Sequence, residues 1–217
     1  DCYGILDGGK AFPVTKDFLG RYPTLVSAIA GRVTEQLELG NSLGLSDVQF
    51  LTPIPDPEKI ICVGLNYSKK YPVEGQAPFL PTEPVVFARF KDTLVAHEES
   101  LQLPKMSPAS ESYDYEGEIV AVIGDMAWQV SEVQALSHVF GYSIMNEGSV
   151  RGYQKHSVHA GKNFYQSGSW GPWITSANDA KQVEEMELET WVNDELRQKA
   201  TGNQMIFSLG KIVSYLS

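Results

Sequence analysis

The stretch Asp114-Tyr-Glu-Gly-Glu-Ile-Val-Ala-Val-Ile123 carries the most information about the fold. Its second half is rich in β-branched residues and is followed by Gly124, which predicts a strand over residues 116–123. Because side chains alternate between the two faces of a strand, Glu116 and Glu118 point to the same face. Both faces are apolar further along, so we expect a buried strand with two carboxylates at its mouth.

Two carboxylates at the end of a buried strand repel each other and lose hydration, so a positive charge must compensate. A divalent cation does this well, because Mg²⁺, Mn²⁺ and Ca²⁺ prefer hard oxygen ligands. A solvated strand end, or pairing with Arg or Lys, would serve equally. A second hydrophobic strand, predicted over residues 139–145, is followed by another acid, Glu147. Three carboxylates at strand ends could bind a metal and leave positions open for water and substrate.

Strands outnumber helices in the rest of the chain. Strands and helices do not alternate along the sequence, so the pattern does not indicate a parallel sheet with crossover helices. The pattern therefore predicts an α+β fold that is mainly β. The predicted strands are residues 59–63, 85–89 and 93–96, with hairpins turning at Gly8-Gly9 and Asn193-Asp194, and the predicted helices are residues 24–39 and 204–217. A proline-rich connector begins at residue 51, and we expect a small N-terminal αβ appendage over residues 1–50 and a core over residues 51–217.

Composition excludes several classes of protein. The 217 residues include 17 Lys and Arg against 27 Asp and Glu, and the formal charge of −10 argues against a nucleic-acid partner. No apolar run approaches the roughly 20 residues that a membrane span needs, so we expect no membrane partner. Cys2 and Cys62 do not make a disulfide framework, which favours a reduced, cytoplasmic protein, and Cys62 is expected to be a small buried hydrophobe.

Taken together, the segments of residues 59–217 resemble the fumarylacetoacetate hydrolase family. The matching segments are Ile-Cys-Val-Gly-Leu-Asn-Tyr (61–67), Pro-Val-Val-Phe-Ala-Arg (84–89), Asp-Tyr-Glu-Gly-Glu-Ile-Val-Ala-Val-Ile-Gly (114–124), Phe-Gly-Tyr (140–142), Asn-Glu-Gly-Ser-Val-Arg (146–151), Gly-Lys-Asn-Phe (161–164), Gly-Pro-Trp (171–173), Val-Asn-Asp-Glu-Leu-Arg-Gln (192–198) and Met-Ile-Phe (205–207). The branch resembled is that of the 2-hydroxyhepta-2,4-diene-1,7-dioate isomerases and acylpyruvases. The resemblance implies a mixed β-sandwich roll like the family's C-terminal domain. Family members continue past the position of Ser217, so we expect this chain to be part of a longer one.

The resemblance also implies a metal and a chemistry. Glu116, Glu118 and Glu147 match the family's three carboxylate ligands for Mg²⁺ or Mn²⁺, with Ca²⁺ as a substitute in crystals. The metal chelates a small 2-oxo or 2,4-dioxo acid and stabilises the enolate bound to it. Hydrolysis of a C–C bond is the main expectation. The alternatives are isomerisation or decarboxylation of a 2-hydroxymuconate-type diacid or oxaloacetate, and a non-catalytic homologue that binds metal and diacid. Family members are commonly homodimers.

Single positions follow from the same resemblance. Lys162 matches a family lysine that stabilises the enolate or orients water, and Gln154 and Arg151 match residues that support the substrate or the metal's surroundings. Arg89 matches a basic residue that can hold a substrate carboxylate.

The chain departs from the family at the water-activating pair of a His and a Glu in hydrolytic members. Lys70 stands at the His position and the nearest acid, Glu74, is one place off. Both are candidate catalytic residues, but Lys70 could bind a substrate carboxylate or simply be a solvated lysine. Gly152 stands where relatives commonly have Asp, which would loosen the orientation of Arg151 or the surroundings of the metal.

Overall fold

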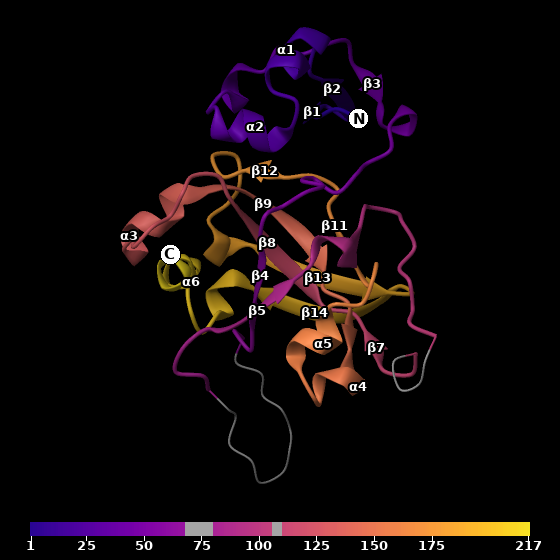
Figure 1. Cartoon of the computed structure of the whole chain (residues 1–217), viewed down its shortest axis with the longest axis vertical. Coiled ribbons are helices and arrows are strands. Elements are labelled where there is room, and N and C mark those ends of the chain that lie inside the picture. The colour runs from indigo at the N-terminus through magenta and orange to yellow at the C-terminus, as the bar shows by residue number, and fades with distance from the viewer. Residues whose placement is uncertain (68–79, 106–109) are drawn as a thin grey trace.

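The computed structural model describes residues 1–67, 80–105 and 110–217, and its centre is a mixed sheet (Figure 1). The sheet has the order β12-β9-β11-β6, and β8 pairs with β9 beside this path. Its strands are β6 (Leu94–Val95), β8 (Gly117–Ile123), β9 (Val139–Asn146), β11 (Gly168–Trp170) and β12 (Thr175–Ser176). The β8–β9, β9–β11 and β9–β12 pairs are antiparallel and the β6–β11 pair is parallel. Such a sheet with few helices is the expected α+β, mainly β fold.

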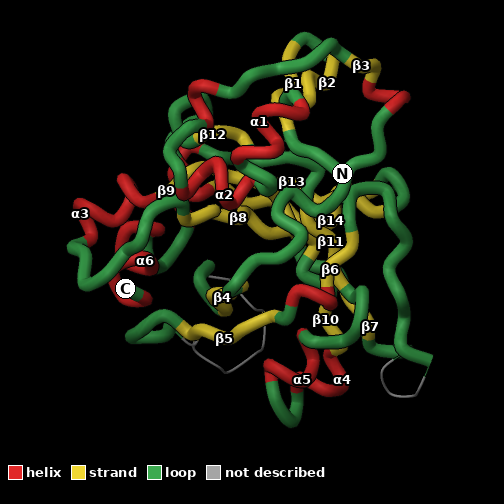
Figure 2. Tube along the Cα trace, turned by 45° about the horizontal axis from the view of Figure 1, so that its top comes forward, coloured by secondary structure: helices red, strands yellow, loops and turns green. Residues whose placement is uncertain are grey.

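Three smaller strand pairs surround this sheet. They are β4 (Ile60–Gly64) with β5 (Val85–Arg89), β7 (Tyr113–Asp114) with β10 (Ser149–Val150), and β13 (Glu187–Val192) with β14 (Glu195–Thr201). The β13–β14 hairpin contacts β8. The short helices α4 (Arg151–Gln154) and α5 (Val158–Lys162) lie beside β7 and β10 (Figure 2). Two further helices, α3 (Glu132–Ala135) and α6 (Leu209–Leu216), pack against each other.

The N-terminal elements gather at one end of the molecule in Figure 1. They are β1 (Gly4–Asp7), β2 (Lys10–Pro13), β3 (Leu43–Gly44), α1 (Lys16–Arg21) and α2 (Leu25–Ala30), and the three strands form one sheet. Single 3₁₀ turns occur at Thr34–Gln36, Leu45–Asp47, Lys91–Thr93, Leu136–His138, Val183–Glu185 and Gly202–Gln204. The division of the chain at residue 50 into two domains stays a prediction.

The hydrophobic core is formed between the central sheet and the proline-rich connector. Ile54, Val122, Met145 and Trp170 are buried together, so the proline-rich connector packs on β8, β9 and β11. The expectation that β8 is buried is wrong, because Val122 is the one buried residue of this strand and Ile123 is 46% exposed. Among the described residues, no helix is long and apolar enough to cross a membrane.

Most predicted strands form within a residue or two of their expected bounds, but the predicted helices are shorter. The helix expected over residues 24–39 ends at Ala30, because Gly31 caps it and Arg32 adopts a positive φ of 53°. The apolar spacing beyond that point belongs to a 3₁₀ turn and extended chain. The helix expected from residue 204 begins at Leu209, where the Ser208 side chain accepts a hydrogen bond from the Lys211 N–H.

Candidate metal centre

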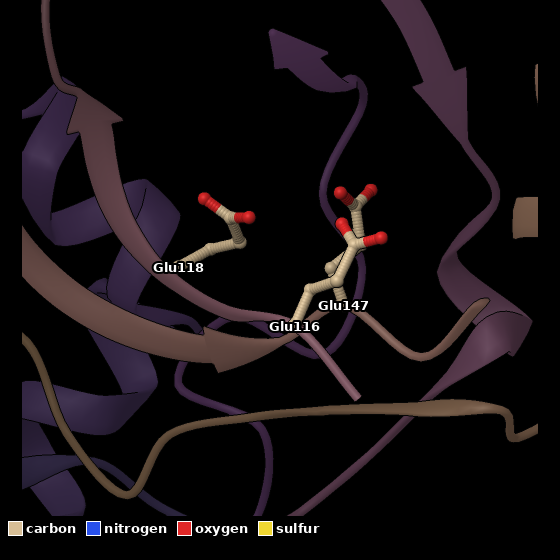
Figure 3. Close-up of side chains that lie close together, drawn as sticks. All are labelled: Glu116, Glu118 and Glu147. Atoms are coloured by element: carbon tan, nitrogen blue, oxygen red, sulfur yellow. The ribbon is translucent and has the colours of Figure 1, made fainter. Parts of the chain in front are cut away.

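Three carboxylates meet where β8 begins and β9 ends. The antiparallel register places Gly117 opposite Asn146, so the residues just outside these strand ends, Glu116 and Glu147, are neighbours. The Glu147 N–H donates to the Glu116 carbonyl at 2.7 Å. Glu116, Glu118 and Glu147 each offer an oxygen, and these oxygens all lie within 4.8 Å of one another. Figure 3 shows the carboxyl groups of Glu116 and Glu147 close together, with Glu118 reaching in from further along β8.

An ammonium group lies against two of these carboxylates. Lys162 Nζ donates to Glu116 Oε2 at 2.6 Å and to Glu147 Oε2 at 2.9 Å, although the residue is only 3% exposed. The same ammonium lies 5.4 Å from the centre of the Phe87 ring, a cation–π contact. Helix α5, which carries Lys162, packs closely against α4. Glycine at position 161 permits this packing, because a Cβ there would approach the Gln154 side chain to 2.3 Å. Lys162 therefore faces the carboxylates and not solvent.

Glu116 has further partners on its other oxygen. Ser149 Oγ donates to Glu116 Oε1 at 2.9 Å, and Arg151 forms an ion pair with the same oxygen. Burial by itself raises the pKa of the Glu116 carboxyl, but Lys162, Arg151 and Ser149 outweigh it and hold the pKa below its ordinary value. Arg151 is held in turn by Asp114 Oδ2 at 2.8 Å and by Gln154 Oε1 at 3.2 Å. Glu116 is thus kept ionised by its neighbours.

Arg89 lies behind Glu147, with a side chain that is fully buried. Its Nη1 donates to the Gly148 carbonyl at 3.0 Å and lies 3.7 Å from Glu147 Oε1. Its Nε and Nη2 donate to the hydroxyls of Thr93 and Ser167, each at 3.2 Å. All three nitrogens of the Arg89 guanidinium group thus contact other residues of the chain. The predicted contact of Arg89 with a substrate carboxylate stays a prediction.

The donors present fit a hard divalent cation. Glu147 Oε1 is buried and has no hydrogen-bond partner among the residues that the structure describes. A buried carboxylate oxygen without a hydrogen-bond donor is costly, and a metal ion would remove that cost. All three candidate ligands are carboxylates, the donor type that Mg²⁺ and Mn²⁺ prefer. The metal prediction therefore agrees with an unsatisfied group as well as with the spacing of the three acids.

The remaining predicted residues separate into two groups. Gln154 and Arg151 bond to each other at the edge of the cluster. Lys70 and Glu74 fall in residues 68–79, outside the described residues, so their catalytic roles stay predictions. Sequence reasoning missed Ser149 and Asp114 as partners of Glu116 and Arg151. Their only sequence signal is that Asp114 stands two residues before Glu116 and Ser149 two residues after Glu147, in the same two motifs.

Comparisons with known proteins give one consistent family. The model described as "Fumarylacetoacetate (FAA) hydrolase C-terminal" matches residues 59–217. The chain is 34% identical over 184 residues to the oxaloacetate tautomerase YisK of Bacillus subtilis (strain 168), covering 83% of this chain and 60% of that protein. The chain thus spans about six tenths of the length of the curated relatives it matches.

Solved structures agree in fold. A 2-hydroxyhepta-2,4-diene-1,7-dioate isomerase from Mycobacterium marinum is 32% identical with a TM-score of 0.71, over 84% of this chain and 66% of that one. A fumarylacetoacetate hydrolase from the psychrophilic Exiguobacterium antarcticum is 27% identical with a TM-score of 0.81, over 99% of this chain and 76% of that one. With most of its length matched by the family model, the chain belongs to the fumarylacetoacetate hydrolase family.

Proposed function

We propose that this protein is a divalent-metal-dependent enzyme that interconverts the keto and enol forms of a short 2-oxo dicarboxylic acid, of which oxaloacetate is the simplest. The observation that carries the proposal is the cluster of three carboxylates with the buried ammonium of Lys162 against two of them. The curated relative at 34% identity is named an oxaloacetate tautomerase, and the solved structure at 32% identity is named an isomerase. Both names favour tautomerisation or isomerisation over the hydrolysis that was the main expectation from sequence.

Glu116, Glu118 and Glu147 would hold the metal, which is Mg²⁺ or Mn²⁺ in this proposal. When bound, a divalent cation acts as a Lewis acid on the 2-oxo and carboxylate oxygens of the substrate. Keto–enol interconversion moves a proton between the 2-oxo oxygen and C3, the carbon next to the 2-oxo carbonyl, and this requires stabilisation of negative charge on the 2-oxo oxygen. A cluster with hard oxygen donors and an adjacent fixed cation suits this task.

Lys162 would supply the second positive charge. An ammonium carries three N–H donors, and the described residues account for two of them, at Glu116 Oε2 and Glu147 Oε2. In the proposal the third donates to the substrate oxygen on which charge develops. Arg151, at the more exposed side of the cluster, would contact the distal carboxylate of the diacid, and Gln154 would hold Arg151 in place.

The test is a panel of substrates with purified protein in Mg²⁺, in Mn²⁺ and after chelation. Loss of the enol form of oxaloacetate is followed by ultraviolet absorbance, pyruvate release reports decarboxylation, and an acylpyruvate reports C–C hydrolysis. We expect the wild-type protein to consume the enol only when metal is present, without releasing pyruvate. We expect the Glu118→Gln variant to have no such activity. Faster hydrolysis of the acylpyruvate than enol loss would overturn the proposal in favour of the hydrolase. Metal binding without turnover of any substrate would favour the non-catalytic homologue.

Two further predictions, one on metal binding and one on oligomeric state, accompany the proposal. Calorimetric titration of the wild-type chain with Mn²⁺ should show one site that Glu116→Ala removes. Family resemblance leads us to propose a homodimer, which light scattering of the purified chain measures directly. A monomer would contradict that part alone and leave the metal site standing.

A further inference from the structure

The side chain of Gln198, on β14, binds both backbone groups of Gly117. Its Oε1 accepts from the Gly117 N–H at 2.9 Å, and its Nε2 donates to the Gly117 carbonyl at 2.7 Å. Gly117 is the residue between the two candidate ligands Glu116 and Glu118. A paired N–H and C=O is what a neighbouring strand offers at a hydrogen-bonded position of an antiparallel ladder. Here one amide side chain provides that pairing at the mouth of β8.

The amide of Gln198 is itself held in orientation. Thr190 stands directly opposite Gln198 in the β13–β14 hairpin, and its Oγ1 donates to Gln198 Oε1 at 3.2 Å. The Gly117 N–H can only donate and the Gly117 carbonyl can only accept, and these two bonds fix which end of the Gln198 amide is oxygen. The hairpin also approaches the ligand segment very closely, because a Cβ on Gly117 would lie 2.1 Å from Thr190 Oγ1. Only glycine allows the hairpin to reach the backbone at this position.

The backbone of Glu116 and Gly117 is therefore hydrogen-bonded on both sides. On the β9 side, the Glu116 N–H donates to Asn146 Oδ1 at 3.2 Å and the Glu116 carbonyl accepts from the Glu147 N–H. On the other side, Gln198 takes both backbone groups of Gly117. The directions of the Glu116 and Glu118 side chains depend on the backbone at Gly117, which lies between them. A rigid backbone there sets the spacing of two of the three carboxylates.

We propose that Gln198 is a positioning residue for the metal site, which acts through the backbone of Gly117 to hold Glu116 and Glu118 at the separation that a divalent cation requires. The proposal rests on the proposed metal site. Partners that orient metal ligands typically change metal affinity by about 10–100-fold when removed, although they never touch the ion. The expected effect of losing the amide of Gln198 is at the lower end of that range.

The experiment is a calorimetric titration of the full chain with Mn²⁺, with urea unfolding of each variant measured beside it. Gln198→Leu keeps a branched side chain of similar bulk on β14 and removes both hydrogen bonds. We expect it to fold and to bind Mn²⁺ about tenfold more weakly than wild type. The matched control is Lys199→Gln on the same strand, whose side chain is half exposed and pairs with Glu187 and Glu189, and its Mn²⁺ affinity should be unchanged.

Each outcome decides the proposal. A folded Gln198→Leu variant with wild-type affinity for Mn²⁺ would overturn it and leave the proposed function intact. A wild-type chain that binds no Mn²⁺ would overturn the metal site and this inference together. If Gln198→Leu does not fold, Thr190→Val decides, because it keeps the amide and removes only the donor that orients it. The loss of one hydrogen bond should then weaken the Mn²⁺ affinity about threefold, and an unchanged affinity would refute the positioning role.

Discussion

Lys162 Nζ lies 2.9 Å from Glu147 Oε2, so a buried ammonium occupies the side of the carboxylate that faces Glu116. The same nitrogen is 2.6 Å from Glu116 Oε2. Lys162 thus supplies part of the positive charge that the three acids require. A bound dication would share this space with an ammonium, and like charges at short range oppose each other.

Replacing Lys162 with Met should therefore tighten metal binding while it abolishes turnover. The repulsion removed is partly screened, and we expect about a tenfold gain in Mn²⁺ affinity, which corresponds to about 1.4 kcal/mol. Calorimetry measures the affinity, and the enol assay measures the loss of activity. Lys91→Met, on the exposed lysine that pairs with Asp56, is the control and should change neither. Weaker Mn²⁺ binding in Lys162→Met would show that the lysine supports the ion instead of competing with it.

Replacing Arg89 with Met should destabilise the fold strongly. The variant leaves the buried Glu147 carboxylate without its second cation and the Gly148 carbonyl without its donor. Breaking a buried ion pair from one side typically costs about 3–5 kcal/mol. Urea unfolding should show a loss of that size, whereas Arg21→Met, on an exposed pair with Glu38, should cost about 1 kcal/mol or less. A small stability loss with a large rise in KM would instead support the predicted contact of Arg89 with substrate.

Replacing Gly148 with Ala should also destabilise the fold, for a steric reason. A Cβ at this position would lie 1.7 Å from the Ser167 carbonyl oxygen and 2.3 Å from the Tyr113 hydroxyl, so the backbone must move. Overpacking of a tight interior costs about 1–3 kcal/mol, and the shift would displace the neighbouring Glu147. Gly20→Ala is the control, since nothing lies within 4 Å of its Cβ and helix α1 should gain stability. Equal urea midpoints for Gly148→Ala and wild type would contradict this packing.

The sequence was a good guide to the three acids because two local rules apply to them. Glu116 and Glu118 share a face by the period of a strand, and Glu147 follows the next long hydrophobic strand. Their meeting in space follows from the antiparallel β8–β9 register, which depends on contacts between residues far apart in sequence. Family resemblance supplied that step where the local pattern could not.

What the sequence could not show is which charge neutralises which. Lys162 reaches Glu116 from 46 residues away, and Arg89 pairs with Glu147 from a different strand, and no local pattern encodes such pairs. Gln198 stood in a recognised motif, but its role needs the docking of the β13–β14 hairpin on Gly117. The prediction of a helix over residues 24–39 was wrong because local sequence was followed too far. The apolar repeat continues past Gly31 and Arg32, where the backbone leaves the helix.

Cys62 should react slowly with alkylating reagents. Cys62 is only partly buried, and not fully buried as its apolar sequence neighbours predict. This partial burial raises the pKa of its thiol, and the nearby carboxylate of Glu147 raises it further. The thiolate is the nucleophile, so a raised pKa leaves little of the reactive form at about pH 8. The sign for stability follows from the same shift. Any contribution of the protonated thiol is complete below the unfolded pKa of about 8.5 and is lost as the pH rises above it.

Iodoacetamide labelling of two single-thiol variants tests this prediction. Cys2→Ser leaves only Cys62, and Cys62→Ser leaves only the exposed Cys2. At about pH 8 we expect the Cys62 chain to label at least about tenfold more slowly than the Cys2 chain, because one pKa unit changes the thiolate fraction about tenfold. In urea both chains should label at similar rates, since unfolding removes the burial and the proximity to Glu147. Equal rates in the folded state would mean that the Cys62 thiol ionises freely beside the candidate metal ligand, contrary to the charge arrangement described for the site.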